Sequence, residues 1–467
     1  MITLRNSLRP VNCLPPEVIA LCATFVSSTN PRPIVSLTHV CRYWRKAITS
    51  SPRNWTSIGS DWKRLVPLCL KHSGAVPLTV SIKVQDINGD ETFLKAILPY
   101  TSRIAHLSLT GHRSIEALAN VIPTLFTSAM HNLISLELQQ SSRSVEPFPS
   151  EVPPSLRISW KLSRLMSLRL TRAPLYPALT SITSLVELAL VGYTVPFDFW
   201  KFTGFLISNP DLQTITLDIQ FTDRPSRVWS ARTVPLPRLR HISFTCAHST
   251  DSRALLSSLH LPRGVFLEVV GSQVNQCFEL SSFLPSPATP IQETLAPIAT
   301  IAYQNYPREV QFHGSDSYLS FRCSRFPFDI YSEFSLFPKT TVREFHVKID
   351  PYSDLSCPLS QLPALETLIL FGIPAFPTQA FAFLTEQPVV CSSLKTIAFF
   401  DCVLDSKVIG ELEEGIARRK NSTAAWLHRI VIVCKSRVLP DHKLILRLQN
   451  HVPCVDARIG NKLPSLT

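Results

Sequence analysis

The sequence predicts an α/β chain in which a short helical segment precedes an irregular solenoid, with a parallel sheet on its concave side and helices outside. Three observations lead to this prediction. Apolar residues recur at helical spacing twice within the first sixty residues. A pattern of the form apolar-x-x-apolar-x-apolar then recurs ten times. Stretches with helical spacing, such as 114–129 and 197–209, lie between these motifs, as stacked strand–helix units require.

The N-terminal segment predicts two helices. Pro15 and Pro16 stand at the start of the first, where a missing N–H group costs no hydrogen bond. Its apolar positions are Val18, Leu21, Cys22 and Phe25. A second helix is expected from Pro33 to the Ser50-Ser51-Pro52 stop, with apolar positions at Ile34, Leu37, Cys41, Trp44 and Ile48. Two helices this short cannot bury a large core. We therefore expect them to form a docking segment that another protein binds.

The order of residues in this segment resembles the F-box. Leu14-Pro15-x-Glu17 is followed by Val40-Cys41-x-x-Trp44, in the order typical of that motif. The resemblance implies a three-helix unit over residues 10–58 that docks on the Skp-type adaptor, and through it on the cullin, of a ubiquitin ligase. Cys22 and Ala23 stand where the family usually has larger apolar residues, so less apolar area is buried and weaker adaptor binding is expected. The alternative is an ordinary helical hairpin that caps the next domain.

The same resemblance implies which residues make up the adaptor-binding unit. It does not separate those that face the adaptor from those that pack internally. The candidate residues are Leu14, Pro15, Glu17, Ile19, Ile34, Leu37, Val40, Cys41 and Trp44.

The recurring motif predicts the strands of the solenoid. In each copy the last two apolar residues alternate along a strand and point inward, and the first apolar residue turns into the same core. The ten copies lie at 103–109, 132–138, 164–170, 184–190, 211–217, 238–244, 341–347, 364–370, 393–399 and 426–432. The first six central residues are Leu107, Leu136, Leu168, Leu188, Ile215 and Ile242. Their spacing centres on the period of leucine-rich repeats, roughly 20–29 residues.

The array over residues 59–467 therefore resembles the divergent leucine-rich repeats found behind F-boxes in mushroom-forming fungi. The segment 62–82 supports this, because it predicts a helix, a stop at Ser73-Gly74 and a strand. Ser- and Pro-rich segments at about 141–157 and 280–297 are expected to be exposed loops. Between 247 and 340 the repeat boundaries are not defined, although 261–270 and 318–323 predict strands. A doubly wound α/β domain is the alternative fold.

The composition of the chain argues against nucleic acid, metal ions and membranes as binding partners. The net charge is +12, but the Lys and Arg residues are dispersed, and the groups Arg42/Arg45/Lys46 and Arg418/Arg419/Lys420 are expected to be solvated helix faces. Binding to nucleic acid is therefore not expected. Twelve cysteines contain no C-x-x-C pair, which predicts no metal site. No apolar run reaches the ~18 residues of a membrane-spanning helix, so no membrane partner is expected.

Catalytic motifs are missing from the sequence: it contains no P-loop, nucleophile elbow, dinucleotide fingerprint or His-Glu-x-x-His. His241, Cys246 and His248 are close in sequence, but a strand followed by a turn explains them. The sequence thus predicts a non-catalytic, cofactor-free protein of the cytoplasm or nucleus, the substrate-recognition subunit of a cullin-RING ubiquitin ligase. The alternatives are an interaction scaffold that recruits no ligase and a basic nucleic-acid-associated protein. The sequence does not identify the substrate.

Overall fold

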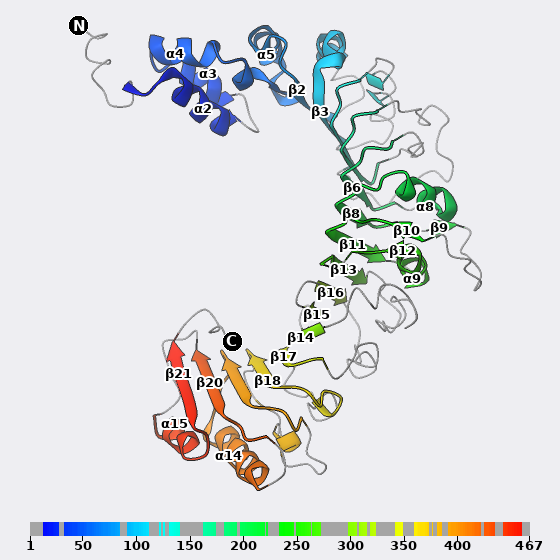
Figure 1. Ribbon diagram of the computed structural model, residues 1–467. Helices are drawn as coiled ribbons and strands as arrows, with labels where there is room; N and C mark the ends of the chain where they lie inside the picture. The colour runs from blue at the N-terminus through cyan, green and yellow to red at the C-terminus, as the bar shows by residue number, and fades with distance from the viewer. Residues whose placement is uncertain are drawn as a thin grey trace. The chain divides into compact units, whose positions relative to one another are not determined.

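A computed structural model describes the chain over 13–27, 32–84, 91–111, 121–122, 125–126, 130–140, 162–173, 182–193, 197–219, 221–222, 233–246, 249–262, 264–271, 298–305, 308–314, 318–323, 341–348, 359–372, 376, 381–384, 391–421, 425–434 and 442–459. It is a mixed α/β protein with extensive parallel sheet. The chain divides into two compact units, residues 1–223 and 224–467. Each unit is built around its own run of parallel strands (Figure 1).

Three short helices lie at the start of the described part of the first unit. They are α2 (Pro16–Ser27), α3 (Arg32–Thr38) and α4 (Arg42–Thr49), followed by the 3-10 turn η2 (Pro52–Trp55). The prediction of one continuous second helix from Pro33 is wrong. Cys41 has an extended backbone (φ −160°), which interrupts the helix, and α4 begins at the next residue. Helical steps of three and four residues continue across this break, so periodicity alone could not detect it.

Among the residues that the structure describes, seven strands form the sheet of the first unit. Each runs parallel to the next, in chain order. They are β1 (Ser57–Gly59), β2 (Leu78–Val84), β3 (Ile104–Gly111), β4 (Ser135–Gln140), β5 (Ser167–Thr171), β6 (Glu187–Val191) and β8 (Thr214–Leu217). The predicted domain boundary between residues 58 and 59 falls inside β1, which pairs with β2.

The core of this sheet is a ladder of aliphatic side chains. The predicted central residues pair directly with one another, in the order Leu107, Leu136, Leu168, Leu188 and Ile215. The last apolar residue of each of these motifs is buried too, from Leu109 to Leu217. The alternation predicted from the sequence is confirmed, because one strand face carries the core and the other carries mainly polar side chains.

Short helices and turns connect these strands. The predicted helix–stop–strand segment is confirmed, since α5 (Val66–Ser73) ends at Gly74, whose φ of +55° suits glycine. The other connecting elements are η3 (Ser60–Leu65), α6 (Glu91–Ile97), η4 (Leu98–Arg103), α8 (Phe199–Ile207) and the two-residue strands β7 (Phe197–Asp198) and β9 (Phe221–Thr222). Figure 1 shows α8 on one side of β6 and β8.

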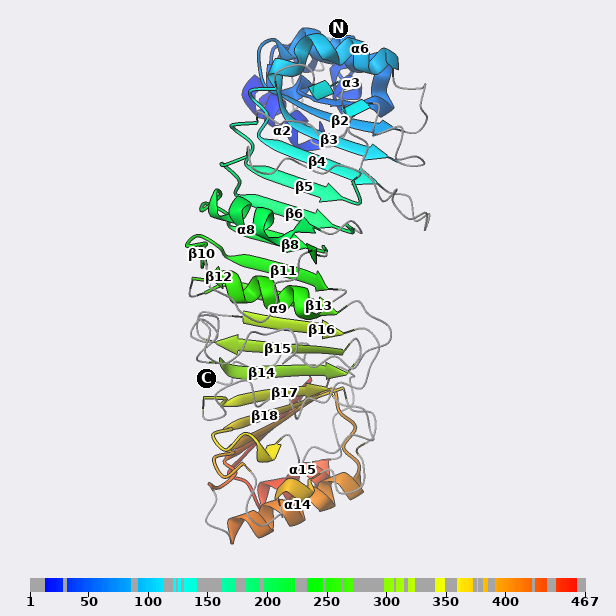
Figure 2. The ribbon, with the colours of Figure 1, turned by 90° about the vertical axis from the view of Figure 1, so that its right-hand side faces the viewer.

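In the described part of the second unit, ten strands form a sheet that is not wholly parallel. Strand β15 (Arg308–Gly314) runs antiparallel to both neighbours, as its reversed arrow shows in Figure 2. The spatial order is β11 (His241–Cys246), β13 (Phe266–Gly271), β16 (Tyr318–Cys323), β15, β14 (Ile298–Asn305), β17 (Glu344–Lys348), β18 (Thr367–Phe371), β19 (Thr396–Phe400), β20 (Arg429–Cys434) and β21 (Cys454–Ile459). The prediction of a parallel sheet is therefore wrong at β15. The strand predicted at 318–323 is confirmed, whereas the strand predicted at 261–270 is confirmed only from residue 266 on, because β13 begins at Phe266.

The other elements described in the second unit are α9 (Ser249–Ser258), the strands β10 (Val234–Pro235) and β12 (Leu259–His260), η8 (Ala382–Leu384), α14 (Ser406–Lys420) and α15 (His442–Gln449). The prediction of a wholly solvated basic face on α14 is wrong at Arg419, which is 1% exposed. The predicted loops at 141–157 and 280–297, and most of the helix at 114–129, lie outside the described residues. Across the part that is described, no helix has both the length and the apolar character to cross a membrane.

Candidate docking surfaces

Helix α2 carries apolar side chains on two opposite sides. Ile19 and Ala23, four residues apart, are buried against the neighbouring helices. The other side is exposed, with Leu21 at 57% and Phe25 at 75% of full exposure. A helix that is apolar all round is normally buried on all sides. The exposed side of α2 therefore has the composition of a surface that another protein covers.

The third helix adds to this exposed surface. The Tyr43 O–H group donates a hydrogen bond of 2.7 Å to the carbonyl oxygen of Leu14, which holds the start of α2 beside α4. Cys41 caps α4 by accepting the Trp44 N–H at its sulfur, 3.5 Å away. Val40, directly before this cap, is exposed. We name the exposed set the helical apolar surface: Leu14, Val18, Leu21, Phe25, Val26, Val40 and Tyr43.

The nine residues predicted for adaptor binding fall into three groups. Leu14, Pro15, Glu17 and Val40 are exposed; Leu37, Cys41 and Trp44 are half-buried; Ile19 and Ile34 are buried inside the helical cluster. The structure adds Val18, Leu21, Phe25, Val26 and Tyr43, which were not among the nine. The four that lie on α2 had a signal in the sequence, because Glu17 and Thr24 are the sole charged or hydroxyl side chains between Pro16 and Val26.

The helical cluster is fixed to the strand that follows it. Thr24 Oγ1 lies 2.6 Å from Oδ1 of the buried Asn54, and the Trp55 Nε1–H group donates to the Ile48 carbonyl oxygen at 3.1 Å. The guanidinium of Arg32 stacks 4.0 Å over the Trp62 ring. Whatever binds the helical apolar surface is therefore held at a defined position relative to the first strands of the unit.

Positive charge predominates in the segment that follows α2. Residues 32–71 contain eight Lys and Arg side chains but a single carboxylate, Asp61, which pairs with Lys83 at 2.6 Å. All eight cations are exposed: Arg32, Arg42, Arg45, Lys46, Arg53, Lys63, Arg64 and Lys71. A partner with an acidic rim would fit this part of the first unit, because opposite charges steer two proteins together.

A second apolar surface lies where strands β4, β5 and β6 begin. The residue before each strand donates its N–H group to the carbonyl oxygen of the residue that precedes the neighbouring strand. The Met166 N–H group thus bonds to the Ile134 carbonyl at 2.8 Å, and the Val186 N–H group bonds to the Met166 carbonyl at 2.7 Å. Ile134 is 37% and Met166 46% exposed, and Val186 is half-buried. We name these three residues the apolar row.

Polar groups lie next to the apolar row on β5 and β6. The Glu187 carboxylate accepts hydrogen bonds from Ser167 and Arg169, each at 2.9 Å. Burial alone would raise the pKa of Glu187, but the bonds from Arg169 and Ser167 outweigh it and lower the pKa below its usual value. The row is thus an apolar strip with a fixed ion pair along one side, which suits contact with a folded protein or a peptide.

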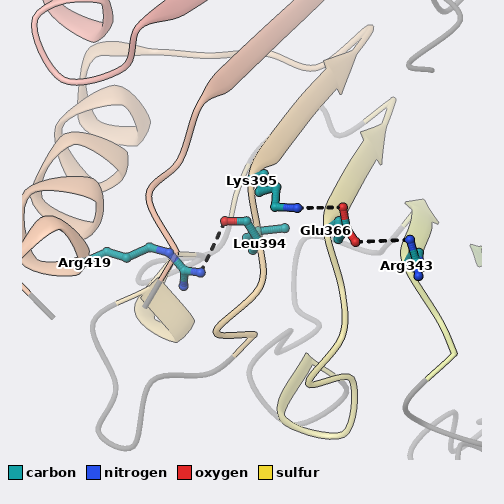
Figure 3. A network of polar contacts seen from close by, with 5 residues as sticks. All are labelled: Arg343, Glu366, Leu394, Lys395 and Arg419. Carbon is teal, nitrogen blue, oxygen red and sulfur yellow. Dashed lines mark hydrogen bonds and ion pairs between the residues drawn. The ribbon is translucent and has the colours of Figure 1, made fainter. Parts of the chain in front are cut away.

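The equivalent positions in the second unit carry polar or charged side chains instead. Arg343, Glu366, Lys395 and His428 stand before β17 to β20 and are joined by the same backbone bonds. Glu366 bridges its neighbours, at 3.6 Å from Arg343 and 3.0 Å from Lys395 (Figure 3). This row satisfies its own charges. The contrast makes the apolar row of the first unit the better candidate for binding another protein.

The described residues include side chains of the kinds that bind metals or act as nucleophiles. No group of three or more His, Cys, Asp or Glu side chains in that part of the chain could hold a metal. Burial raises the pKa of Cys69 to about 11 and that of Cys391 to about 12, so both thiols stay protonated and poorly nucleophilic. His241 is the first and Cys246 the last residue of β11, which corrects the expected turn position of Cys246; His248 lies outside the described residues.

No protein-family model matches the chain, and no curated protein matches it either.

Proposed function

We propose that this protein is the substrate-receptor subunit of an SCF-type, cullin-RING ubiquitin ligase. Its N-terminal helices are an F-box that binds a Skp-type adaptor, and through it the cullin. Its strand array is a divergent leucine-rich-repeat domain that binds a protein substrate. The chain takes no part in chemistry, and it acts by raising the effective concentration of substrate lysines near the ubiquitin-charged enzyme.

The exposed apolar side of α2 carries this proposal. Leu14 and Val40, from the two halves of the F-box-like pattern, both belong to the helical apolar surface, and Tyr43 bonds to the Leu14 carbonyl. Burying side chains as large as Leu21 and Phe25 stabilises a complex by about 25 cal/mol per Å² of apolar area. The surface is therefore suited to a permanently bound partner whose binding site is an apolar groove with an acidic rim.

Cys22 and Ala23 affect this docking differently from the expectation drawn from family resemblance. Ala23 is fully buried inside the helical cluster, so its small size belongs to internal packing. Cys22 is exposed and offers the adaptor less apolar area than a larger residue would. We expect Phe25, on the same side of α2, to supply much of the contact area instead.

Adaptor capture tests the proposal. The tagged full chain is co-expressed with a Skp-type adaptor and cullin, and the captured adaptor is quantified for the wild type, Leu21→Glu and Phe25→Glu. Each substitution places a carboxylate in the contact and is expected to reduce capture at least tenfold. Because both side chains are exposed in the free protein, the fold is expected to survive, as circular dichroism would check.

Val403→Glu is the matched control. Val403 is also an exposed apolar residue, but it lies in the second unit, so this variant should capture adaptor like the wild type. Wild-type protein that captures no adaptor would refute the ligase proposal and leave the ligase-independent scaffold. Equal capture by all four proteins would show that the adaptor does not bind through the helical apolar surface.

A further inference from the structure

Strand β21 ends the sheet of the second unit. It pairs in parallel register with β20, from Cys454 opposite Arg429 to Ile459 opposite Cys434. Within the described residues its other edge pairs with no strand, and Figure 1 shows it as the last strand beside β20. The backbone N–H and C=O groups of such an edge are a template for pairing with another chain.

The side chains of β21 are less covered than those of the strand beside it. In β20 every residue after Arg429 is buried. In β21, Val455, Asp456 and Ala457 are half-buried, Arg458 is exposed, and Ile459 is 50% exposed. Helix α15 packs on β21 and leaves Leu446 exposed. The end of this sheet therefore has backbone groups that pair with no other described strand, and it also has uncovered apolar side chains.

We propose that β21 pairs with β21 of a second copy of this chain, antiparallel, about a two-fold axis at Ala457. In that register Val455 lies opposite Ile459 of the other copy, and Asp456 lies opposite Arg458, each pair occurring twice. Residues directly opposite one another in an antiparallel pair lie about 4.5–5.5 Å apart at Cα, so these side chains meet. The strand is self-complementary in charge and in apolar character, as a two-fold interface requires.

The charges of β21 favour the antiparallel arrangement of the two copies over the parallel one. Two copies of β21 paired in parallel and in register would set Asp456 against Asp456, which is repulsive. In the antiparallel pair each Asp456 gains the other copy's Arg458 in addition to Arg429 of its own β20, which lies 3.7 Å away. Val455, Ala457 and Ile459 meanwhile continue the rows that contain the buried Ile430, Ile432 and Cys434. The apolar core thus extends across the two-fold axis.

A charge swap tests the pairing. Sedimentation of the full-length protein is expected to show a dimer with a dissociation constant below about 1 mM. Arg458→Asp sets Asp456 against a second carboxylate and should weaken the dimer at least tenfold, whereas the double variant Asp456→Arg/Arg458→Asp restores opposite charges and should recover it. A monomeric wild type, or a dimer unaffected by Arg458→Asp, would overturn the proposal. Because Asp456→Arg also faces Arg429, thermal melting must show that the double variant is folded.

A cross-link tests the register independently. On a Cys454→Ser background, Ala457→Cys places two thiols opposite each other at the two-fold axis, within the roughly 4.4–6.8 Å between Cα atoms that a disulfide spans. Mild oxidation should give a disulfide-linked dimer, identified by the peptide in which the two introduced cysteines are joined. Ile459→Cys on the same background is the control, since its partner would be Val455, and it should cross-link far less. Equal cross-linking of the two variants would refute the proposed register.

Discussion

The guanidinium of Arg419 donates a hydrogen bond of 2.7 Å to the carbonyl oxygen of Cys391, and this bond joins helix α14 to the segment that leads into β19. The same side chain donates to the carbonyls of Ala425 at 3.1 Å and Leu394 at 3.3 Å, the latter drawn in Figure 3. One buried cation thus supplies donors to three backbone carbonyls around α14. Burial lowers the pKa of Arg419, which measures the cost of keeping this charge away from water.

Replacing Arg419 with Met should destabilise the second unit. The substitution keeps an unbranched side chain of comparable length but removes the donors to Cys391, Leu394 and Ala425, and buried carbonyls without donors are costly. We expect the free energy of unfolding to fall by about 2–3 kcal/mol. Urea denaturation measures the loss of free energy of unfolding. Hydrogen exchange of the β19 amides then shows whether this loss affects the strand next to Arg419.

Arg418→Met is the control for that experiment. Arg418 is the preceding residue of α14, but it is exposed and pairs with Glu414 at the surface. Exposed ion pairs of this kind contribute little, so the change should stay within about 0.5 kcal/mol. If both variants lost the same stability, the buried hydrogen bonds of Arg419 would not be the cause.

Two glycines of the first unit should respond to alanine in opposite directions. Gly192 has φ +72°, and a Cβ atom there would lie 2.7 Å from Cγ of Arg172. Gly192→Ala is therefore expected to lower the free energy of unfolding by about 1–2 kcal/mol from backbone strain, with the contact adding to it. Gly204 lies inside α8 with nothing within 4 Å of its Cβ position, so Gly204→Ala should raise stability by about 0.5–1 kcal/mol. Thermal melting of both variants compares them, and a stabilising Gly192→Ala would contradict the geometry.

Much of the strand arrangement could be predicted from the sequence, because a strand with one buried face has an apolar residue at every second position. Leu107 and Leu136, predicted as equivalent positions, pair directly. The reversal at β15 could not be predicted, since an apolar pattern specifies which face is buried and leaves the direction of the neighbouring strand open. The burial of Arg419 was missed for a different reason: it stands between two other cations, Arg418 and Lys420, and such runs usually face water.

The candidate docking surfaces were predicted only in part. Leu14 and Val40 were found because they belong to the F-box-like pattern. Phe25 was seen as an apolar helix position, but spacing alone does not tell which of two apolar sides of α2 faces the protein. The apolar row was missed altogether, because Ile134, Met166 and Val186 occupy the same place in separate motifs and become neighbours only when the strands pair.

Met166→Glu should weaken substrate binding if the apolar row of the first unit holds the substrate of the proposed ligase. The substitution puts a carboxylate at the middle of the row, next to Ile134 and Val186, and a loss of about 1.4 kcal/mol corresponds to tenfold weaker binding. Because Met166 is already 46% exposed, stability should change by no more than about 0.5 kcal/mol. Quantitative mass spectrometry of proteins captured with the proteasome inhibited measures the effect, with co-captured adaptor as the internal standard.

Ile207→Glu gives this comparison its control. Ile207 is exposed to a similar degree in the same unit, but it lies at the end of α8 and outside the apolar row. A substrate held by the row should be lost from Met166→Glu and retained by Ile207→Glu, while adaptor recovery stays equal in both, because the helical apolar surface is unchanged. Equal retention of the substrate by the two variants would exclude the apolar row as the substrate-binding site and would favour another surface of the strand array. Loss of adaptor from Met166→Glu would instead show that the substitution disturbs the unit as a whole.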